Sequence, residues 1–196
     1  MKLTILHQER YSRLELLLRT FFGWLYMALP HGFILMFLGI WSAILSFVAF
    51  WVVLFTGRYP QSMYEFQVGN MRWGLRLRAR LVNLCDGYPG FGINASDDHV
   101  SFEMAYPESL SRGLLLLRLF FGWIYVMIPH GFMLFFRSIA TWVVIFLAWW
   151  IVLFTGEYPL SFHSYATGLL RWSARVNAYM LFMTDEYPPF TGKEVE

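Results

Sequence analysis

The chain has 196 residues and a formal net charge of +2, yet only 14% of its residues are charged, whereas 58% are hydrophobic and 20% are aromatic. A soluble domain normally carries about a quarter charged residues, so this composition argues against an ordinary water-soluble domain and indicates a membrane protein. The only cysteine, Cys85, excludes an internal disulfide and any cysteine-cluster metal or Fe–S site within one chain.

The chain contains a tandem repeat. Shifting residues 12–91 by 99 positions superimposes them on residues 111–190 without a gap, and nearly half of the paired positions are identical. We therefore divide the chain into a first unit (1–91), a polar linker (92–109) and a second unit (110–196). Two like membrane units usually imply a pseudo-two-fold axis.

Each unit begins with a long apolar run. Residues 20–56 contain no Asp, Glu, Lys or Arg, and residues 119–155 contain only Arg137. Both runs exceed the ~20 residues that a spanning helix needs. A single helix per run would place the Arg-rich stretch 58–118 across the membrane from both termini, against the positive-inside tendency. We therefore predict a helical hairpin over 20–56 and over 119–155, with turns near residues 38–39 and 137–138.

A Pro-His-Gly triplet lies inside each apolar run, where proline should bend the helix and free a carbonyl that needs a donor. The triplets are Pro30, His31 and Gly32 in the first unit and Pro129, His130 and Gly131 in the second. The interpretation we favour is structural: a kink, an imidazole that bridges helices by hydrogen bonding, and a close approach at glycine. One alternative is cofactor binding, in which the two imidazoles meet across the pseudo-two-fold axis as ligands of haem b or a metal, or as neighbours of a quinone. A lipid-linked or proton-linked role is the other.

Each apolar run ends in TGxYP, which we interpret as a stop signal. Its glycine can take the left-handed conformation that ends a helix, its tyrosine suits the membrane interface, and its proline prevents continuation. These residues are Gly57, Tyr59 and Pro60, and Gly156, Tyr158 and Pro159.

An amphipathic helix is predicted after each stop, over 66–85 and 165–184. Arginines recur every four residues along one face, as in a helix that lies among lipid headgroups. The candidate headgroup contacts are Arg72, Arg76, Arg80, Arg171 and Arg175. Asp86 and Asp185 follow at the ends of these helices, where the helix dipole repels a carboxylate. We therefore expect a salt bridge from each to a nearby arginine.

Four motifs together resemble a known family. PHGFxLxF, WxVLFTGxYP, GxxRWxxRVxAY and TDEYPPF, all between Pro129 and Phe190, are similar to the bacterial membrane-protein family called domain of unknown function 4389. The first unit carries a diverged copy of these motifs, in which CDGYPGF stands in place of TDEYPPF. The resemblance implies a bacterial inner-membrane protein with repeated units, and it brings no established activity.

These observations predict an all-α integral membrane protein of two tandem repeats, each a transmembrane helical hairpin followed by an interfacial amphipathic helix. Its basic flanks and termini should be cytoplasmic. No nucleophile–base pair, metal-ligand motif or nucleotide fingerprint is visible in the sequence, so we expect a non-catalytic accessory or scaffold subunit. Its expected partners are the bilayer and either another membrane protein or copies of itself, and not nucleic acid.

Overall fold

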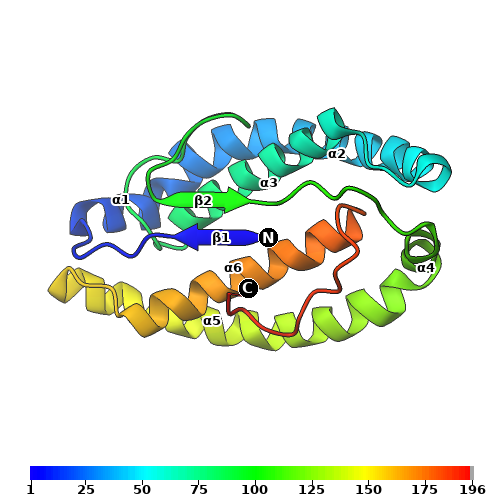
Figure 1. Cartoon of the computed structure of the whole chain (residues 1–196). Helices are drawn as coiled ribbons and strands as arrows, with labels where there is room; N and C mark the ends of the chain where they lie inside the picture. Colours follow the sequence, from blue (N-terminus) through cyan, green and yellow to red (C-terminus); the bar gives the residue numbers. More distant parts are fainter. Residues whose placement is uncertain (195–196) are drawn as a thin grey trace.

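The computed structural model describes residues 1–194 and is mainly helical. The helical elements of the first unit are α1 (Arg13–Gly23), the π-helical turn η1 (Trp24–Ala28), α2 (Leu29–Thr56) and α3 (Gln61–Leu81). Those of the second unit are α4 (Arg112–Gly122), η2 (Trp123–Met127), α5 (Ile128–Thr155) and α6 (Leu160–Met180). Two short strands, β1 (Lys2–Ile5) and β2 (Val100–Glu103), pair as one antiparallel ribbon. The two-unit helical organisation is as predicted, and Figure 1 shows the units side by side.

Each apolar run is part of one continuous helix of 44 residues, not a hairpin. We call Arg13–Thr56 and Arg112–Thr155 the two long helices. The residues at the proposed turns are helical, and Gly39 is absent from the residues with a positive φ. No proline or Asn-Gly pair accompanies that glycine, and its neighbours are good helix formers, so nothing local stops the helix. The hairpin prediction is wrong.

The positive-inside argument failed because it treated the arginines as solvent-exposed flanking charges. Arg76, Arg80 and Arg118 are instead at most 2% exposed and are bonded inside the protein. The positive-inside tendency concerns exposed flanking charges, so arginines that are bonded inside the protein give no reason to predict a turn in the middle of the apolar run.

The helix ends follow their local signals. Ser12 and Ser111 cap the long helices, each accepting a hydrogen bond from the backbone amide three residues later. Gly57 (φ 74°) and Gly156 (φ 79°) end them in the left-handed conformation, which confirms that part of the stop-signal prediction. Pro60 and Pro159 then precede the first residues of α3 and α6, so these helices begin about five residues earlier than predicted.

The two units clamp each other at both ends of the molecule. The amide of Tyr11 donates to the carbonyl of Gly156, and the amide of Leu110 donates to the carbonyl of Gly57, both at 2.8 Å. We call the segment just before each long helix, residues 6–12 and 104–111, the lead-in of its unit. The lead-in of each unit therefore covers the end of the other unit's long helix. As a result the long helices run antiparallel (Figure 1), and they contact each other near both ends, α1 against α5 and α4 against α2.

The ribbon was not predicted. β2 lies in the linker that we expected to be only a polar connection, and β1 precedes the first long helix. Their side chains alternate between buried and exposed, so Leu3 and Phe102, paired across the ribbon, are both buried. The ribbon covers α3 and α6, since Arg72 Nε donates to the carbonyl of Phe102 and Arg171 donates to that of Leu3.

Candidate functional site

The Pro-His-Gly triplet, the Trp of α6 and the last loop meet in one aromatic cluster in the second unit. The ring of His130 stacks on Phe190 with 4.0 Å between centroids, lies edge-on to Trp172 and tilts against Tyr187 at 5.3 Å. Two motifs that are distant from PHG in sequence, RW and DEYPPF, thereby contact its imidazole.

The first unit repeats this cluster with a different ring geometry. His31 lies edge-on to Trp73 and tilts against Tyr88 and Phe91, with centroids 5.1 Å and 4.7 Å away. Both histidines are fully buried. Each is enclosed by rings of its own unit, so the structure shows two separate imidazole clusters in place of one shared pair.

One hydrogen bond fixes the chemistry of each imidazole. Trp73 Nε1 donates to His31 Nδ1 at 2.7 Å, and Trp172 Nε1 donates to His130 Nδ1 at 2.9 Å. An indole N–H can only donate, so Nδ1 must accept, and a neutral imidazole then carries its proton on Nε2. Neither Nε2 has a hydrogen-bond partner among the described residues, although both are buried.

The prolines do free a carbonyl, and a tyrosine satisfies it. Pro129 has no N–H for the carbonyl of Tyr125, four residues earlier, and the turn between them is the π-helical η2. The hydroxyl of Tyr187 donates to that carbonyl at 2.8 Å. In the first unit Tyr88 donates to the carbonyl of Tyr26 at 3.2 Å. The imidazole, which we expected to bridge helices, does so as the acceptor of an indole N–H.

The expected close approach at the following glycine is wrong. A Cβ at Gly32 or Gly131 would meet nothing within 4 Å, so these glycines lie against open space. A tight helix contact occurs about two and a half turns earlier, at Gly122, where a Cβ would lie 3.3 Å from Met180. No feature of the structure explains why glycine follows each histidine.

The arginine rows of α3 and α6 point into the protein. Arg76 is fully buried and donates to the carbonyls of Ala95 and Gly92 in the linker. Arg175, 8% exposed, donates to the carbonyls of Thr191 and Lys193. Both arginines therefore hold the loop that follows their helix.

The other candidate arginines have equivalent roles. Arg171, 8% exposed, holds β1 and Gly192, and Arg72 holds β2. Arg80 pairs with Asp97 at 2.9 Å. Burial alone would raise the pKa of Asp97, but the Arg80 guanidinium and two backbone amides lower it below its usual value. The structure therefore corrects the prediction that these side chains face lipid headgroups: they hold loops and strands onto the helices.

Both predicted aspartate salt bridges are present. Asp86 pairs with Arg19 at 2.7 Å and Asp185 pairs with Arg118 at 2.5 Å. The second oxygen of each carboxylate accepts from the amide of the serine that caps a long helix, at 2.6 Å in both units. Asp86 and Asp185 therefore link the last loop of each unit to the start of its long helix.

The stop-signal tyrosines are buried and do not form an interfacial belt. Tyr59 is 0% and Tyr158 3% exposed. Tyr158 packs at a tilt against Tyr11, and its carbonyl accepts from His7. No local sequence signal predicts that the lead-in of one unit covers this tyrosine of the other.

These clustered motifs are also those that a family model matches. The model described as "Domain of unknown function (DUF4389)" matches residues 15–91 and again residues 115–192. The chain belongs to the DUF4389 family. No curated protein and no solved structure was found to match the chain. Each match spans one PHG-to-PxF segment, so in this DUF4389 protein the family unit and the structural repeat coincide.

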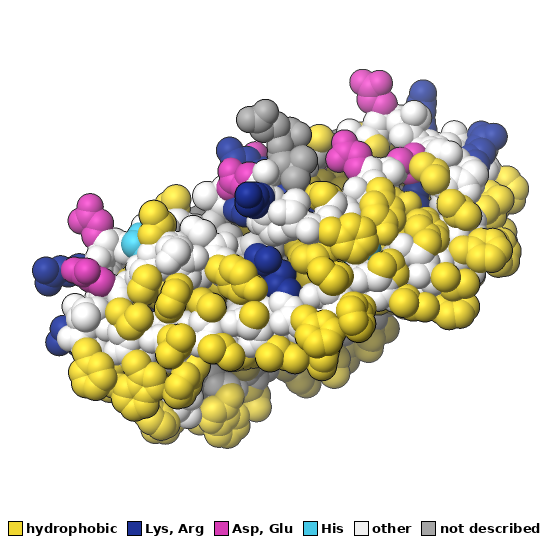
Figure 2. Space-filling model, turned by 90° about the horizontal axis from the view of Figure 1, so that it is seen from below, with side chains coloured by type: hydrophobic (Ala, Val, Ile, Leu, Met, Phe, Trp, Pro, Cys, Tyr) yellow, Lys and Arg dark blue, Asp and Glu magenta, His cyan; other side chains and the backbone are white. Residues whose placement is uncertain are grey.

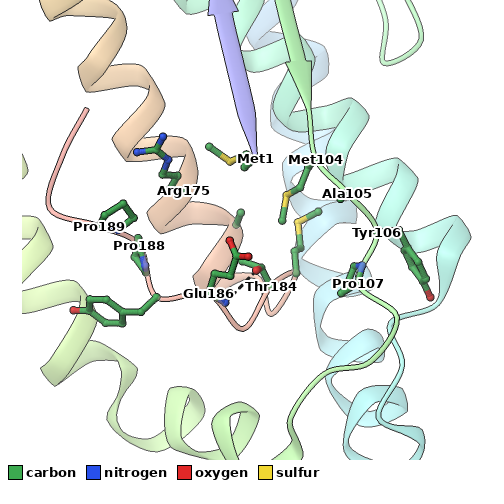
Figure 3. A pocket seen from close by; sticks show the side chains of 13 residues that line it. Met1, Met104, Ala105, Tyr106, Pro107, Arg175, Thr184, Glu186, Pro188 and Pro189 are labelled. Atoms are coloured by element: carbon green, nitrogen blue, oxygen red, sulfur yellow. Dashed lines mark hydrogen bonds between the residues drawn. The ribbon is translucent and has the colours of Figure 1, made fainter. Parts of the chain in front are cut away.

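A cleft lies where the last loop approaches the linker, and Figure 3 shows the side chains that line it. Its volume is about 410 Å³, within the range of small-ligand sites. Met1, Met104 and Met183 supply much of its apolar wall, with Arg175 and Glu186 as charged groups. Neither histidine of the DUF4389 motif lines this cleft, so it is separate from the aromatic clusters.

The long helices of this DUF4389 protein carry an extensive exposed apolar surface. We define the outer apolar face as the exposed Leu, Ile, Val, Met, Phe and Trp side chains of residues 14–55 and 116–154. In the most apolar window of each long helix only 17% of the residues are buried, unlike the core helix of a soluble protein. Both helices are long and apolar enough to cross a membrane. Figure 2 shows this face as a broad hydrophobic area.

Proposed function

We propose that the protein is a non-catalytic scaffold or accessory subunit of the bacterial inner membrane, which packs against lipid and against another membrane protein or further copies of itself. The outer apolar face carries this proposal. Phe33, Phe47 and Phe132 on this face are 62–65% exposed, and soluble monomers rarely expose contiguous apolar patches beyond a few hundred square ångströms. A surface of this kind requires lipid or protein to cover it.

The internal use of the polar groups supports a binding role over a catalytic one. The arginines predicted to contact headgroups bond to backbone carbonyls or carboxylates of the same chain. Among the described residues no group of three His, Cys, Asp or Glu side chains could hold a metal ion. The polar side chains of this fold position its own loops.

Fractionation tests the membrane part of the proposal. The protein should remain in the membrane pellet after alkaline carbonate extraction. A double variant of the outer apolar face, Phe33→Glu with Phe132→Glu, should shift toward the soluble or aggregated fraction. Ser101→Glu is the matched control, because Ser101 is exposed on β2. Recovery of the unmodified protein in the carbonate supernatant would overturn the proposal.

Purification in mild detergent from the native membrane tests the scaffold part. We expect a stoichiometric membrane protein partner, or a homo-oligomer, to be identified by mass spectrometry. A lone monomer that retains neither partner nor lipid would contradict this role.

The second candidate function is quinone binding, which the buried Nε2–H of each histidine favours because it could donate a hydrogen bond to a quinone carbonyl. Haem ligation fits less well: iron needs an unprotonated nitrogen, and the indole N–H at Nδ1 keeps the proton on Nε2. Extraction of the purified protein and chromatography of the lipid fraction would reveal a bound quinone. A visible-range haem band would contradict the tautomer assigned to His31 and His130.

A further inference from the structure

The long helices are much longer than a bilayer is thick. At 1.5 Å per residue, 44 residues extend about 66 Å, against a hydrocarbon core of about 30 Å. The outer apolar face continues without a break from Leu14 to Phe55. To keep that whole stretch within the core while crossing it, the helix would have to tilt by about 60°, beyond the 0–40° seen for spanning helices.

A polar surface lies beside the middle of the long helices. His31, near the midpoint of the first long helix, bonds to Trp73 of α3, and the adjacent Arg72 bonds to β2. The ribbon therefore lies at mid-length, and its last pair, Lys2 opposite Glu103, is exposed. Figure 1 shows the same placement, with the ribbon and both termini near the centre of the long axis.

Charged side chains follow this side of the molecule for its whole length. In Figure 2 most of them gather along one long edge, whereas hydrophobic side chains are spread over the rest of the visible face from end to end, interrupted by a Lys or Arg area near its middle. The division between polar and apolar surface thus runs parallel to the long helices. In a protein that spans a bilayer along its long axis, the division would run across them.

We propose that the protein lies flat, with its long axis in the membrane plane, the outer apolar face in the hydrocarbon of one leaflet and the ribbon in water. This proposal rests on the membrane association proposed above and specifies its geometry. An upright position would place exposed Lys2 and Glu103 at the level of the hydrocarbon, where charged side chains are costly. In the flat position both charges stay in water while every residue of the outer apolar face can reach lipid.

Two exposed glutamates mark the opposite ends of the molecule and allow a direct test. Glu157 follows Gly156, which bonds to the lead-in of the first unit, and Glu108 precedes Leu110, which bonds to Gly57 at the far end. Cysteines would be introduced singly as Glu108→Cys, Glu157→Cys and, at mid-length on the ribbon, Ser101→Cys. Each would be treated with a membrane-impermeant maleimide in right-side-out and in inverted native membrane vesicles.

The native thiol does not interfere with this labelling. Cys85 is fully buried, and burial raises the pKa of its thiol to about 11, so little thiolate is present at neutral pH. The unmodified protein serves as the control and should remain unlabelled in both vesicle types.

The flat geometry predicts that all three positions label from the same side of the membrane. Labelling of the two ends from opposite sides would show that the protein spans the bilayer and would overturn the proposal. An end that labels only after detergent is added would also contradict it, because that end would lie in the hydrocarbon. A protein that carbonate releases from the vesicles would instead overturn the membrane association itself.

Depth measurements on the outer apolar face provide an independent readout. Nitroxide labels would be attached to Leu14→Cys, Phe33→Cys and Phe55→Cys, and their depth would be measured as the ratio of spin relaxation by oxygen to relaxation by a water-soluble nickel complex. The flat geometry predicts the same depth at all three positions. An upright helix would bury Phe33 deeper than both ends. Spin–spin coupling between molecules, with low oxygen access, would show that a second copy covers this face and would overturn the lipid assignment.

Discussion

Replacing Trp172 by Phe should destabilise the second unit through one hydrogen bond. The indole N–H donates to His130 at 2.9 Å, with the tryptophan 3% and the histidine 0% exposed. The variant keeps an aromatic ring but leaves a buried Nδ1 acceptor without a donor. An unpaired buried acceptor costs about 1–3 kcal/mol, so we expect the free energy of unfolding to fall by about 2 kcal/mol.

Thermal unfolding in mild detergent, followed by near-ultraviolet circular dichroism, measures the effect. For a chain of this size, about 2 kcal/mol corresponds to a decrease in Tm of about 4–8 °C. Trp142→Phe is the matched control, because Trp142 is 62% exposed on α5, and it should change the free energy of unfolding by about 0.5 kcal/mol or less.

A double-mutant cycle separates the hydrogen bond from the lost ring volume. His130→Leu alone leaves the indole N–H unpaired, whereas the double variant removes both partners and should cost less than the sum of the single variants. We expect a coupling energy of about 1–2 kcal/mol. Additive single effects, or a Trp172→Phe variant as stable as the control, would refute the reasoning about the tautomer and its donor.

Three further predictions follow from the same fold. Tyr187→Phe removes the hydroxyl that donates to the carbonyl of Tyr125, which Pro129 leaves without its helical donor. It should lower the free energy of unfolding, measured by chemical denaturation, by about 1 kcal/mol, less than Trp172→Phe because Tyr187 is 42% exposed. Arg118→Met should lower the free energy of unfolding by about 3 kcal/mol, because it leaves the Asp185 carboxylate with only a backbone donor. Arg10→Met, at an exposed arginine, is the control and should have little effect in the same assay. Burial lowers the pKa of His163 to about 4. Between about pH 6.5 and pH 4 the unfolded chain therefore binds a proton at this histidine and the folded chain does not, so the free energy of unfolding should fall as the pH drops through that window. In melting curves recorded across this pH range, His163→Phe should weaken the dependence of stability on pH.

Sequence signals that act locally predicted the structure well. The glycines of TGxYP end the long helices in the left-handed conformation because only glycine adopts it without strain. The aspartate salt bridges were predictable because a carboxylate at a helix C-terminus requires a cation nearby. The helix ends could be predicted from residues within a few positions of each other. The salt bridges could be predicted because a carboxylate at the C-terminus of a helix needs a cation, whichever residue supplies it.

Features that depend on long-range contacts were not predictable from one sequence. The periodic arginines of α3 fit a headgroup-facing helix and an internally bonded helix equally well, and only the linker carbonyls 16 and 19 positions beyond Arg76 decide between them. The ribbon joins residues about 100 positions apart. The continuous helix was missed because the flanking arginines were counted as solvent-exposed charges on one side of a membrane, whereas Arg80 and Arg118 pair with carboxylates inside the fold.

The reciprocal clamps between the units bear on how such a chain could arise. Each long helix ends against the lead-in of the other unit, so a single unit would leave the carbonyl of Gly57 and the side of its own lead-in uncovered. A single-unit ancestor would therefore have to meet a second copy that closes both ends by two-fold symmetry. Fusing two such genes would keep both clamps in one chain. After fusion the two copies can also diverge in sequence, as they have at Arg78 and its counterpart Asn177.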